Sequence, residues 1–349
     1  MTNCSMLKYI QPKNIDFKIL EEILKPCEKS NHYTNSGPVK KLLETKLESL
    51  LNIDKDRAVL CTTNGTAALH AIYYFLIKQN KDLKIVTPAF TFPSAVVGTD
   101  NVEILDIDQE TYTIPFDMKT IASYDVFVIT NLFGTYPSNI MQWVEWCKKL
   151  NKTLIFDNAS SPLSEVDGIN ICNLGDFSFG SLHHTKSIGF GEGGFIVLPK
   201  KMYKLFEQIL CFGFRQGSLK RKYQKNSSNL KMSDIAAASI LQNIERYNLT
   251  KHIENQTTLI KELQNIPRIE VFNYSKGVVY GNMPVLYEEA MDIGIFRANN
   301  IEVQKYYYPL KPYENSLSLF DRMINIPLYA NMSRQDIQRI IEVVKESLI

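Results

Sequence analysis

The chain has 349 residues, 45% of them hydrophobic and 22% charged, which is the composition of an ordinary globular protein and excludes a disordered or fibrous one. Its 39 Lys and Arg nearly balance its 37 Asp and Glu, giving a formal net charge of +2 at pH 7, which argues against a nucleic-acid or membrane partner and favours a small, specific ligand. At about 150 residues per domain, the length predicts two packed domains.

Short apolar runs alternate with helical patterns through the first two thirds of the chain. A helix is predicted from Gly37-Pro38 to Leu51, because apolar residues recur there at helical spacing. The predicted strands are 58–62, 84–87, 102–107, 126–130, 153–156, 176–182 and 195–198. The other predicted helices are 66–79, 139–150, 200–211 and 233–247. Because several strands are apolar throughout, we expect an α/β fold, with a parallel or mixed sheet between helices.

The pattern changes after residue 248. The predicted elements there are helices 250–264, 288–299 and 333–347 and strands 269–272 and 278–286. We expect a large α/β domain over residues 15–248 and a small α+β domain over 249–349, with residues 1–14 packing against the small domain. The polar segment 220–231 is interpreted either as a mobile loop over a site or as a solvated connector.

The cysteines and the N-terminal residues indicate where the protein resides. The six cysteines are scattered, without a C-x-x-C pair or metal-ligand spacing against the five histidines, as in a reducing compartment. The start, MTNCSMLKYIQPKN, lacks the features of a signal peptide, and no apolar run is long enough to span a bilayer. We therefore expect a cytoplasmic protein that binds no metal and no membrane.

Two polar features lie where predicted strands end. Asn64-Gly65-Thr66-Ala67-Ala68-Leu69 follows one strand and opens a helix, so its free N–H groups form an anion site or, as an equal alternative, a plain turn with a helix cap. Asp157 follows the strand 153–156, at the sheet edge where open α/β folds bind ligands. Taken alone, Asp157 is also typical of a loop aspartate that caps the next turn.

A glycine-rich segment follows the predicted strand 176–182. Gly189, Gly191 and Gly194 satisfy the G-x-G-x-x-G pattern of dinucleotide-binding folds. That pattern has to follow a strand and open a helix, whereas a strand is predicted directly after it at 195–198. We therefore interpret the glycines as a tight hairpin, and a nicotinamide oxidoreductase is the least favoured function.

Lys186 lies between the predicted strand and these glycines, in apolar surroundings. A buried lysine has a lowered pKa and is the type that forms Schiff bases, although most lysines are merely solvated. His183 and His184 are more often packing or hydrogen-bonding residues than catalysts. Together, however, an anion site, a strand-end Asp and a downstream Lys are what pyridoxal 5'-phosphate (PLP) requires: a phosphate cradle, a partner for the pyridinium nitrogen and an amine.

The sequence resembles the DegT/StrS family of PLP-dependent nucleotide-sugar aminotransferases of fold type I. The resemblance runs in order through nearly the whole chain. The matching segments are Gly37-Pro38, Asn64-Gly65-Thr66-Ala67-Ala68-Leu69, Pro88-Ala89-Phe90-Thr91-Phe92, Asp106-Ile107-Asp108, Asp157-Asn158-Ala159, residues 181–186, Gly191-Glu192-Gly193-Gly194, Asp234-Ile235-Ala236-Ala237-Ala238, Tyr308-Pro309-Leu310 and Ile326-Pro327-Leu328-Tyr329. It implies a seven-stranded, mostly parallel sheet between helices plus a small C-terminal domain.

The resemblance also implies a role for individual residues. Lys186 corresponds to the Schiff-base lysine, and Asp157 to the carboxylate that keeps the pyridinium nitrogen protonated. The other cofactor-binding positions are Gly65, Thr66 and Ser181 at the phosphate, Phe92 stacked on the ring, Ser160 beside the ring oxygen, and Asn229 reaching the phosphate of a second subunit. A homodimer with a shared active site follows from the position of Asn229.

Several residues depart from the family pattern or leave the substrate open. Ser160 stands where the family usually has Gln, so that contact is lost or made through water. Lys231 replaces a frequent Arg, and Lys311 follows Pro309-Leu310 where His is common. The positions expected near the substrate are His183, Lys231, Tyr308 and Lys311. Some relatives carry His in place of the lysine and act as dehydratases, whereas Lys186 favours transamination.

The resemblance implies transfer of an amino group from L-glutamate to a nucleotide-linked keto-6-deoxy sugar, with the cofactor passing through its pyridoxamine form (PMP). We expect the amino group at C4 of an NDP-4-keto-6-deoxy-D-glucose, giving the 4-amino-4,6-dideoxy sugar nucleotide. The alternative is a 3-aminotransferase that acts on an NDP-3-keto-6-deoxyhexose. An alternative of another class is a PLP-binding regulatory protein without catalysis.

Overall fold

The fold is built on a seven-stranded sheet. The computed structural model describes residues 5–214 and 222–349. In spatial order the strands are β1 (Arg57–Thr62), β9 (Gly194–Pro199), β8 (Phe177–Ser181), β5 (Thr153–Asp157), β4 (Val126–Thr130), β2 (Ile85–Pro88) and β3 (Val102–Leu105). All neighbours are parallel except β9, which is antiparallel to both β1 and β8. The predicted mixed, mostly parallel sheet is confirmed.

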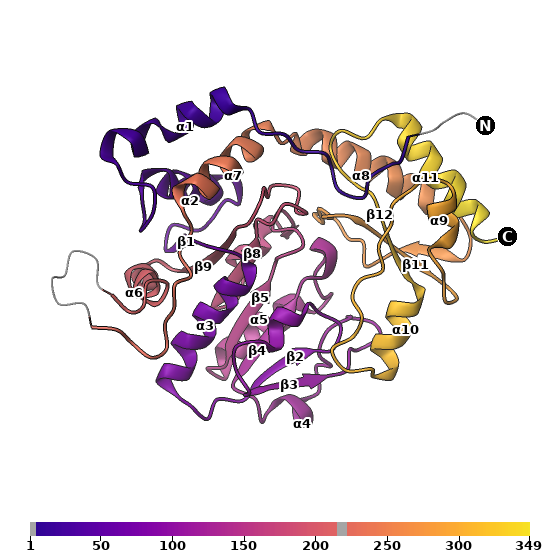
Figure 1. Ribbon diagram of the computed structural model, residues 1–349. Coiled ribbons are helices and arrows are strands. Elements are labelled where there is room, and N and C mark those ends of the chain that lie inside the picture. Colours follow the sequence, from indigo (N-terminus) through magenta and orange to yellow (C-terminus); the bar gives the residue numbers. More distant parts are fainter. Residues whose placement is uncertain (1–4, 215–221) are drawn as a thin grey trace.

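Helices cover both faces of this sheet (Figure 1). In β4, Val126 and Val128 pack in the same core cluster as helix α3 (Gly65–Gln79), whereas Phe127 and Ile129 pack in the cluster of α5 (Ile140–Lys149). Successive side chains of a strand point to opposite faces, so a strand buried on both sides is apolar throughout. The remaining helices of this part are α1 (Phe17–Ser30), α2 (Pro38–Leu50), α4 (Met118–Ile121), α6 (Tyr203–Ile209) and α7 (Asp234–Arg246).

The C-terminal part adds a second, smaller sheet. Its antiparallel strands are β10 (Ile269–Val271), β11 (Met283–Tyr287) and β12 (Met323–Ile326), with α8 (Leu249–Leu263), α9 (Gly294–Ala298), α10 (Glu314–Arg322) and α11 (Arg334–Glu346) around them. A two-stranded ribbon, β6 (Glu165–Val166) and β7 (Ile169–Asn170), lies in the preceding part. One hydrophobic core joins the central strands to this C-terminal part, as with Phe156 and Val285. The division at residue 248 stays a prediction.

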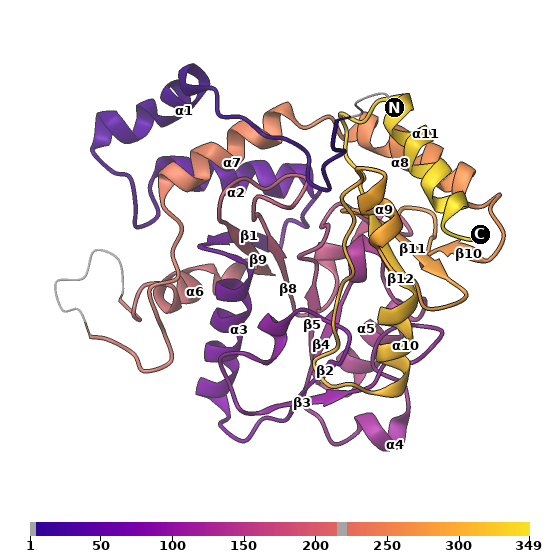
Figure 2. The same cartoon turned by 45° about the vertical axis from the view of Figure 1, so that its right-hand side comes forward.

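The N-terminal segment crosses the molecule from α1 to the C-terminal elements, as Figures 1 and 2 both show. Leu7 N donates to Asn300 O at 2.9 Å, and Glu302 N donates to Leu7 O at 2.9 Å.

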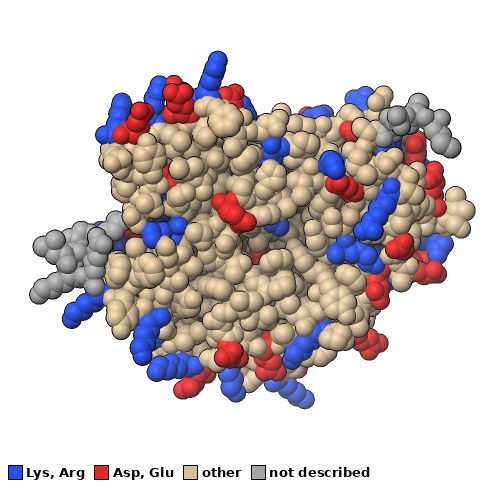
Figure 3. Space-filling model, in the orientation of Figure 1, with Lys and Arg blue, Asp and Glu red and all other residues tan. Residues whose placement is uncertain are grey.

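On the face shown in Figure 3, acidic and basic side chains are interspersed around the edges. Within residues 5–214 and 222–349, none of the helices is both long and apolar enough to cross a membrane.

The predicted elements differ from the structure mainly after residue 248. The helix predicted at 288–299 forms only over Gly294–Ala298, and the strand predicted at 278–286 begins at Met283. Helix α10 and strand β12 were not predicted, because Met323 follows Arg322 directly and no turn residue separates the two elements. Helix α1 was not predicted either, because Cys27 is its one buried residue and Pro26 interrupts the helical pattern.

Candidate active site

A cavity of about 500 Å³ opens where the central strands end. Its lining includes Thr130 and Asp157 at the ends of β4 and β5, Ser181 at the end of β8, and the first residues of α3. Ligands of open α/β folds bind at this edge of the sheet. The sequence-predicted residues that the structure brings together here are Gly65, Thr66, Phe92, Asp157, Ser160, Ser181, His183 and Lys186.

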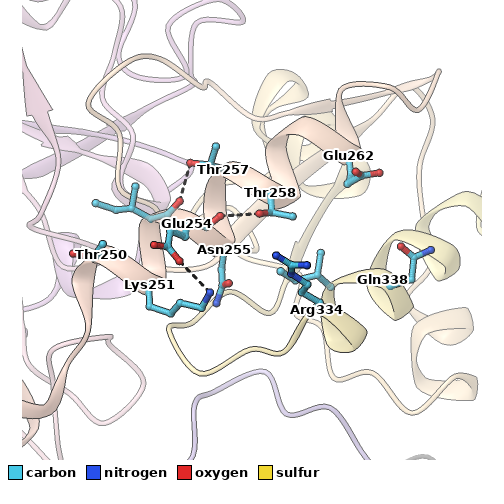
Figure 4. Close-up of a pocket in the computed structure, with 11 residues that line it drawn as sticks. Thr250, Lys251, Glu254, Asn255, Thr257, Thr258, Glu262, Arg334 and Gln338 are labelled. Atoms are coloured by element: carbon cyan, nitrogen blue, oxygen red, sulfur yellow. Dashed lines mark hydrogen bonds and ion pairs between the residues drawn. The ribbon is translucent and has the colours of Figure 1, made fainter.

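A larger hollow of about 730 Å³ lies between α8 and α11 (Figure 4). Several of its polar side chains already have partners in the protein: Lys251 Nζ is 3.0 Å from Glu254 Oε2, and Thr258 Oγ1 donates to Glu254 O at 2.9 Å. None of the residues predicted to act in the site lines this hollow. The chemistry suggested by the sequence therefore belongs to the smaller cavity.

The start of α3 forms one wall of the cavity and provides an anion site. Asn64 caps the helix, because its Oδ1 accepts a hydrogen bond from Ala67 N at 2.8 Å. The amides of Gly65 and Thr66 lie in the first turn, where no carbonyl of the helix can accept from them. A Cβ at Gly65 would lie 3.4 Å from Ser181 Cβ. The helix start and the end of β8 thus converge on one place, with N–H and hydroxyl groups suited to a phosphate.

Asp157 is a buried carboxylate at the bottom of the site. It is 3% exposed, and one of its oxygens accepts a hydrogen bond from Ala159 N at 2.8 Å. Burial raises its pKa to about 6, against the opposing effects of the Ala159 hydrogen bond and the Lys186 charge. Among the described residues, no Lys, Arg or His forms an ion pair with it. A carboxylate desolvated in this way is stabilised by a cationic group of a ligand.

Lys186 lies in the loop between β8 and β9. Lys186 N donates to His183 O at 2.9 Å, and Gly189 N donates to Lys186 O at 3.0 Å, so the backbone forms a tight turn. Gly194 opens β9, antiparallel to β8, which confirms the hairpin interpretation of the glycines and excludes a strand-to-helix dinucleotide motif. Burial lowers the pKa of the Lys186 amine, and the Asp157 carboxylate acts in the opposite direction.

His183 and Glu192 form a polar pair at the rim of the cavity. Thr185 N, which can only donate, lies 3.3 Å from His183 Nδ1, so we assign the imidazole hydrogen to Nε2. That Nε2 is 3.6 Å from Glu192 Oε1. The neighbouring His184 does not line the cavity and packs edge-on against Phe190 at a ring distance of 5.3 Å. His183 is therefore the histidine placed to meet a ligand.

Aromatic side chains form a further wall of the cavity, and only one of them was predicted from the sequence. Phe92 is 52% exposed and meets the Tyr307 ring edge-on at 6.1 Å. Tyr307 also stacks on Phe133 at 5.8 Å, and its hydroxyl lies 3.5 Å from Ser160 Oγ. Tyr306 and Tyr9 complete this wall. The run of three tyrosines before Pro309 was the available signal for Tyr306 and Tyr307; Tyr9 had none.

Four predicted residues lie outside the cavity. Tyr308 is 66% exposed and packs edge-on against Phe320, and the Lys311 amine lies over the Tyr313 ring. Asn229 Oδ1 accepts a hydrogen bond from Lys231 Nζ, and both residues belong to an exposed or half-buried segment beside β1. Residues 220 and 221 of the predicted polar loop lie outside the described residues. The expected roles of these four residues in the site stay predictions.

The residues of the cavity fit PLP. The free amides at the start of α3 suit its phosphate, the unpaired buried Asp157 suits a protonated ring nitrogen, and the amine of Lys186 suits its aldehyde. Phe92 provides an exposed aromatic face for the ring. A buried carboxylate, a desolvated amine and amides without an acceptor are each costly, and one ligand would offset all of these costs.

Known proteins share both the sequence pattern and the fold. Residues 15–345 match the family described as DegT/DnrJ/EryC1/StrS aminotransferase family. The dTDP-4-amino-4,6-dideoxy-D-glucose transaminase of Shigella dysenteriae is 24% identical over 367 residues, covering 94% of this chain and 96% of that protein. The GDP-perosamine synthase of Escherichia coli O157:H7 is 24% identical over 354 residues, covering 93% of this chain and 94% of that protein.

A solved structure confirms the fold. The PLP form of Spr1654 from Streptococcus pneumoniae superposes with a TM-score of 0.84 at 20% identity, covering 98% of each chain. Its PMP form superposes equally well, with a TM-score of 0.84. The chain therefore belongs to the DegT/DnrJ/EryC1/StrS aminotransferase family and is a PLP-dependent aminotransferase of fold type I.

Proposed function

We propose that the protein transfers the amino group of L-glutamate to C4 of a nucleotide-linked 4-keto-6-deoxy-D-glucose, giving the 4-amino-4,6-dideoxy sugar nucleotide. The observation that carries the proposal is the cavity in which Lys186, Asp157 and the start of α3 meet. The substrate assignment is supported by the two relatives at 24% identity, one of which is named as a 4-amino-4,6-dideoxy-D-glucose transaminase.

The residues of the cavity can perform the steps that amino transfer requires. Bound PLP supplies an aldehyde that takes up the amino group and a ring that withdraws electrons. The Lys186 Nζ, made less basic by burial, can take a proton from the carbon that loses the amino group and would deliver it to the aldehyde-derived carbon of the bound cofactor. Asp157 provides a fixed negative charge for the cationic ring nitrogen, while Gly65, Thr66 and Ser181 hold the phosphate.

We also propose that two copies of the chain share each site. Lys186 is the single Lys or Arg among the described residues that line the cavity, which also contains the carboxylates of Asp157 and Glu192. L-glutamate and a nucleotide diphosphate are anions, so further positive charge has to reach the site from outside this lining. The exposed or half-buried segment with Asn229 and Lys231 offers the Lys231 charge and the Asn229 amide to a second subunit.

Complementation between two inactive variants tests the shared site. Mixing Lys186→Ala with Asn229→Ala subunits after mild dissociation should restore about one quarter of the wild-type sites, because random pairing makes half the dimers mixed and each mixed dimer has one intact site. Amino transfer is measured before and after mixing, and light scattering checks for twice the 40.0 kDa chain mass. A mixture as inactive as its components would contradict sharing through Asn229.

A screen of nucleotide-linked keto sugars tests the substrate. We expect the isotope-labelled amino nitrogen of L-glutamate to appear by mass spectrometry in the product of a 4-keto-6-deoxy sugar nucleotide. Product from a 3-keto isomer alone would replace the C4 assignment by C3. The visible spectrum should also return from the amino to the aldehyde form of the cofactor when the keto sugar is added. Bound PLP with no spectral change under any substrate would favour a regulatory protein.

A further inference from the structure

The amine of Lys13 is enclosed by backbone carbonyls. Lys13 Nζ donates to His184 O at 2.8 Å, to Lys186 O at 2.5 Å and to Gly189 O at 2.7 Å. A lysine ammonium has three donors, and all three are used here. In the part of the chain that the structure describes, no acidic side chain forms an ion pair with it. Lys13 is therefore a partly buried cation held by carbonyl dipoles alone.

These carbonyls belong to the turn that presents Lys186, and one of them is the carbonyl of Lys186 itself. Asn243 Nδ2 adds hydrogen bonds at 3.2 Å to Ser187 O and to Gly189 O. Carbonyl oxygens that converge on one point repel one another and lose their water, unless a cation or donor lies between them. The conformation of the turn thus depends on side chains from two distant segments.

The segment that carries Lys13 is itself anchored. Asp16 N donates to Gln242 Oε1 at 2.8 Å, and Gln242 Nε2 donates back to Asp16 O at 2.7 Å. Arg246 Nη1 adds a hydrogen bond to Asn14 O at 3.2 Å. On the N-terminal side of Lys13, Tyr9 lines the cavity. Lys13 is therefore held in place before any ligand binds.

We propose that Lys13 is a positioning residue, a tethered cation that fixes the turn 184–189 and thereby places the amine of Lys186 in the cavity. The inference rests on the proposed catalytic role of Lys186. Burial lowers the pKa of Lys13 to about 8, so its amine is still mostly protonated at pH 7. A displacement of a reacting group by about 1 Å costs about 100-fold in rate, which is the loss expected when Lys13 is replaced.

Rescue by a free cation tests this role. Lys13→Ala leaves the three carbonyls facing a space that an ammonium ion can enter, whereas Lys13→Met fills that space with an apolar side chain. Ammonium chloride should raise the rate of amino transfer by Lys13→Ala at least about tenfold. Tetramethylammonium chloride at the same concentration should restore none of it, and neither salt should rescue Lys13→Met. Equal effects of the two salts on Lys13→Ala would overturn the proposal.

Hydrogen exchange gives a second readout that does not depend on the substrate. In the full-length chain without cofactor, amides 184–189 should exchange faster in Lys13→Ala than in the wild type, and ammonium should slow them again. The matched control is Lys152→Ala, because Lys152 Nζ also donates to two carbonyls, of Ala122 and Tyr124, but at the start of β5. It should leave amides 184–189 unchanged.

The exchange result separates this proposal from the proposed function, since a wrong substrate assignment would leave the exchange pattern intact. If amides 184–189 of Lys13→Ala exchange at the same rate as in the wild type, the positioning role is overturned, whatever the substrate is. If Lys13→Ala does not fold in either salt, Lys13→Gln takes its place, because it keeps two N–H donors without the charge. Faster exchange of amides 184–189 in that variant supports the proposal, and unchanged exchange overturns it.

Discussion

Replacing Lys186 by Ala should lower the rate of amino transfer from L-glutamate by about 10⁴-fold, the upper end of what a positioned acid–base group contributes. The variant should also lose the visible absorbance of the lysine-bound cofactor. Both losses follow from the structure, because Lys186 is the one lysine that lines the cavity among the residues described. Absorbance spectra and single-turnover kinetics measure the two effects.

The control for this variant is Lys201→Ala, at an exposed position outside the cavity. It removes a lysine of the same chain and should leave both the spectrum and the rate unchanged. If Lys186→Ala kept a measurable rate near that of the wild type, another amine would have to perform the reaction, and the assignment of Lys186 would be wrong.

Replacing Asp157 by Asn should lower the rate by about 100-fold to 1,000-fold, because a neutral amide cannot hold the positive charge at the ring nitrogen. Asn keeps the size of the side chain and an oxygen that can accept from Ala159 N, so the local backbone should persist. Binding of PLP, followed by its spectrum, separates weaker binding from slower chemistry. A variant as fast as the wild type would show that Asp157 does not support the reaction.

The same substitution should stabilise the protein without cofactor. The pKa of Asp157 rises from its ordinary value of 3.8 to about 6 in the folded chain. At pH values between these two, the folded state therefore binds more protons at Asp157 than the unfolded state does. The free energy of unfolding therefore falls as the pH rises through this window, by about 2 to 3 kcal/mol in total. At pH 7 to 8, Asp157→Asn should be more stable than the wild type, and the difference should vanish below about pH 4.

Denaturant unfolding of the cofactor-free chains at several pH values measures this effect. Asp100→Asn, at an exposed loop position, is the control and should not change the curve. An Asp157→Asn variant less stable than the wild type at pH 8 would mean that the carboxylate is favourably bonded without its ligand. The expected result instead identifies Asp157 as a group held at a cost to stability, which the bound cofactor offsets.

The cavity residues proposed to act in the reaction were predictable because each is tied to a local pattern. Asp157 lies at the end of a strand, and Gly65 and Thr66 open a helix, so both motifs lie at the same edge of the mostly parallel sheet. Alternation of side chains explains why the strands of the large sheet were identified as apolar runs. Strand β12 begins at Met323, directly after α10, and no turn residue separates the two elements. The local pattern therefore gave no sign of where one element ends and the next begins.

The aromatic wall shows where local patterns end. Tyr306, Tyr307 and Tyr308 are identical in kind and adjacent, yet Tyr306 and Tyr307 line the cavity while Tyr308 is 66% exposed. Which of them turns inward depends on packing against Phe92 and Phe133, from segments far away in the chain. A resemblance that matched Tyr308 by its place before Pro309 could not decide this.

The sequence by itself determined the fold class, the cofactor and the order of the groups proposed to bind it, because periodicity, strand ends and helix starts are properties of neighbouring residues. The tertiary structure alone decided which aromatic side chains enclose the cavity and how the turn with Lys186 is held. Lys13 lies 171 residues from His184 in the sequence, yet its amine donates to the carbonyl of His184. Only the folded chain brings such partners together, because a contact of this kind has no periodic signal and arises from the packing of whole elements.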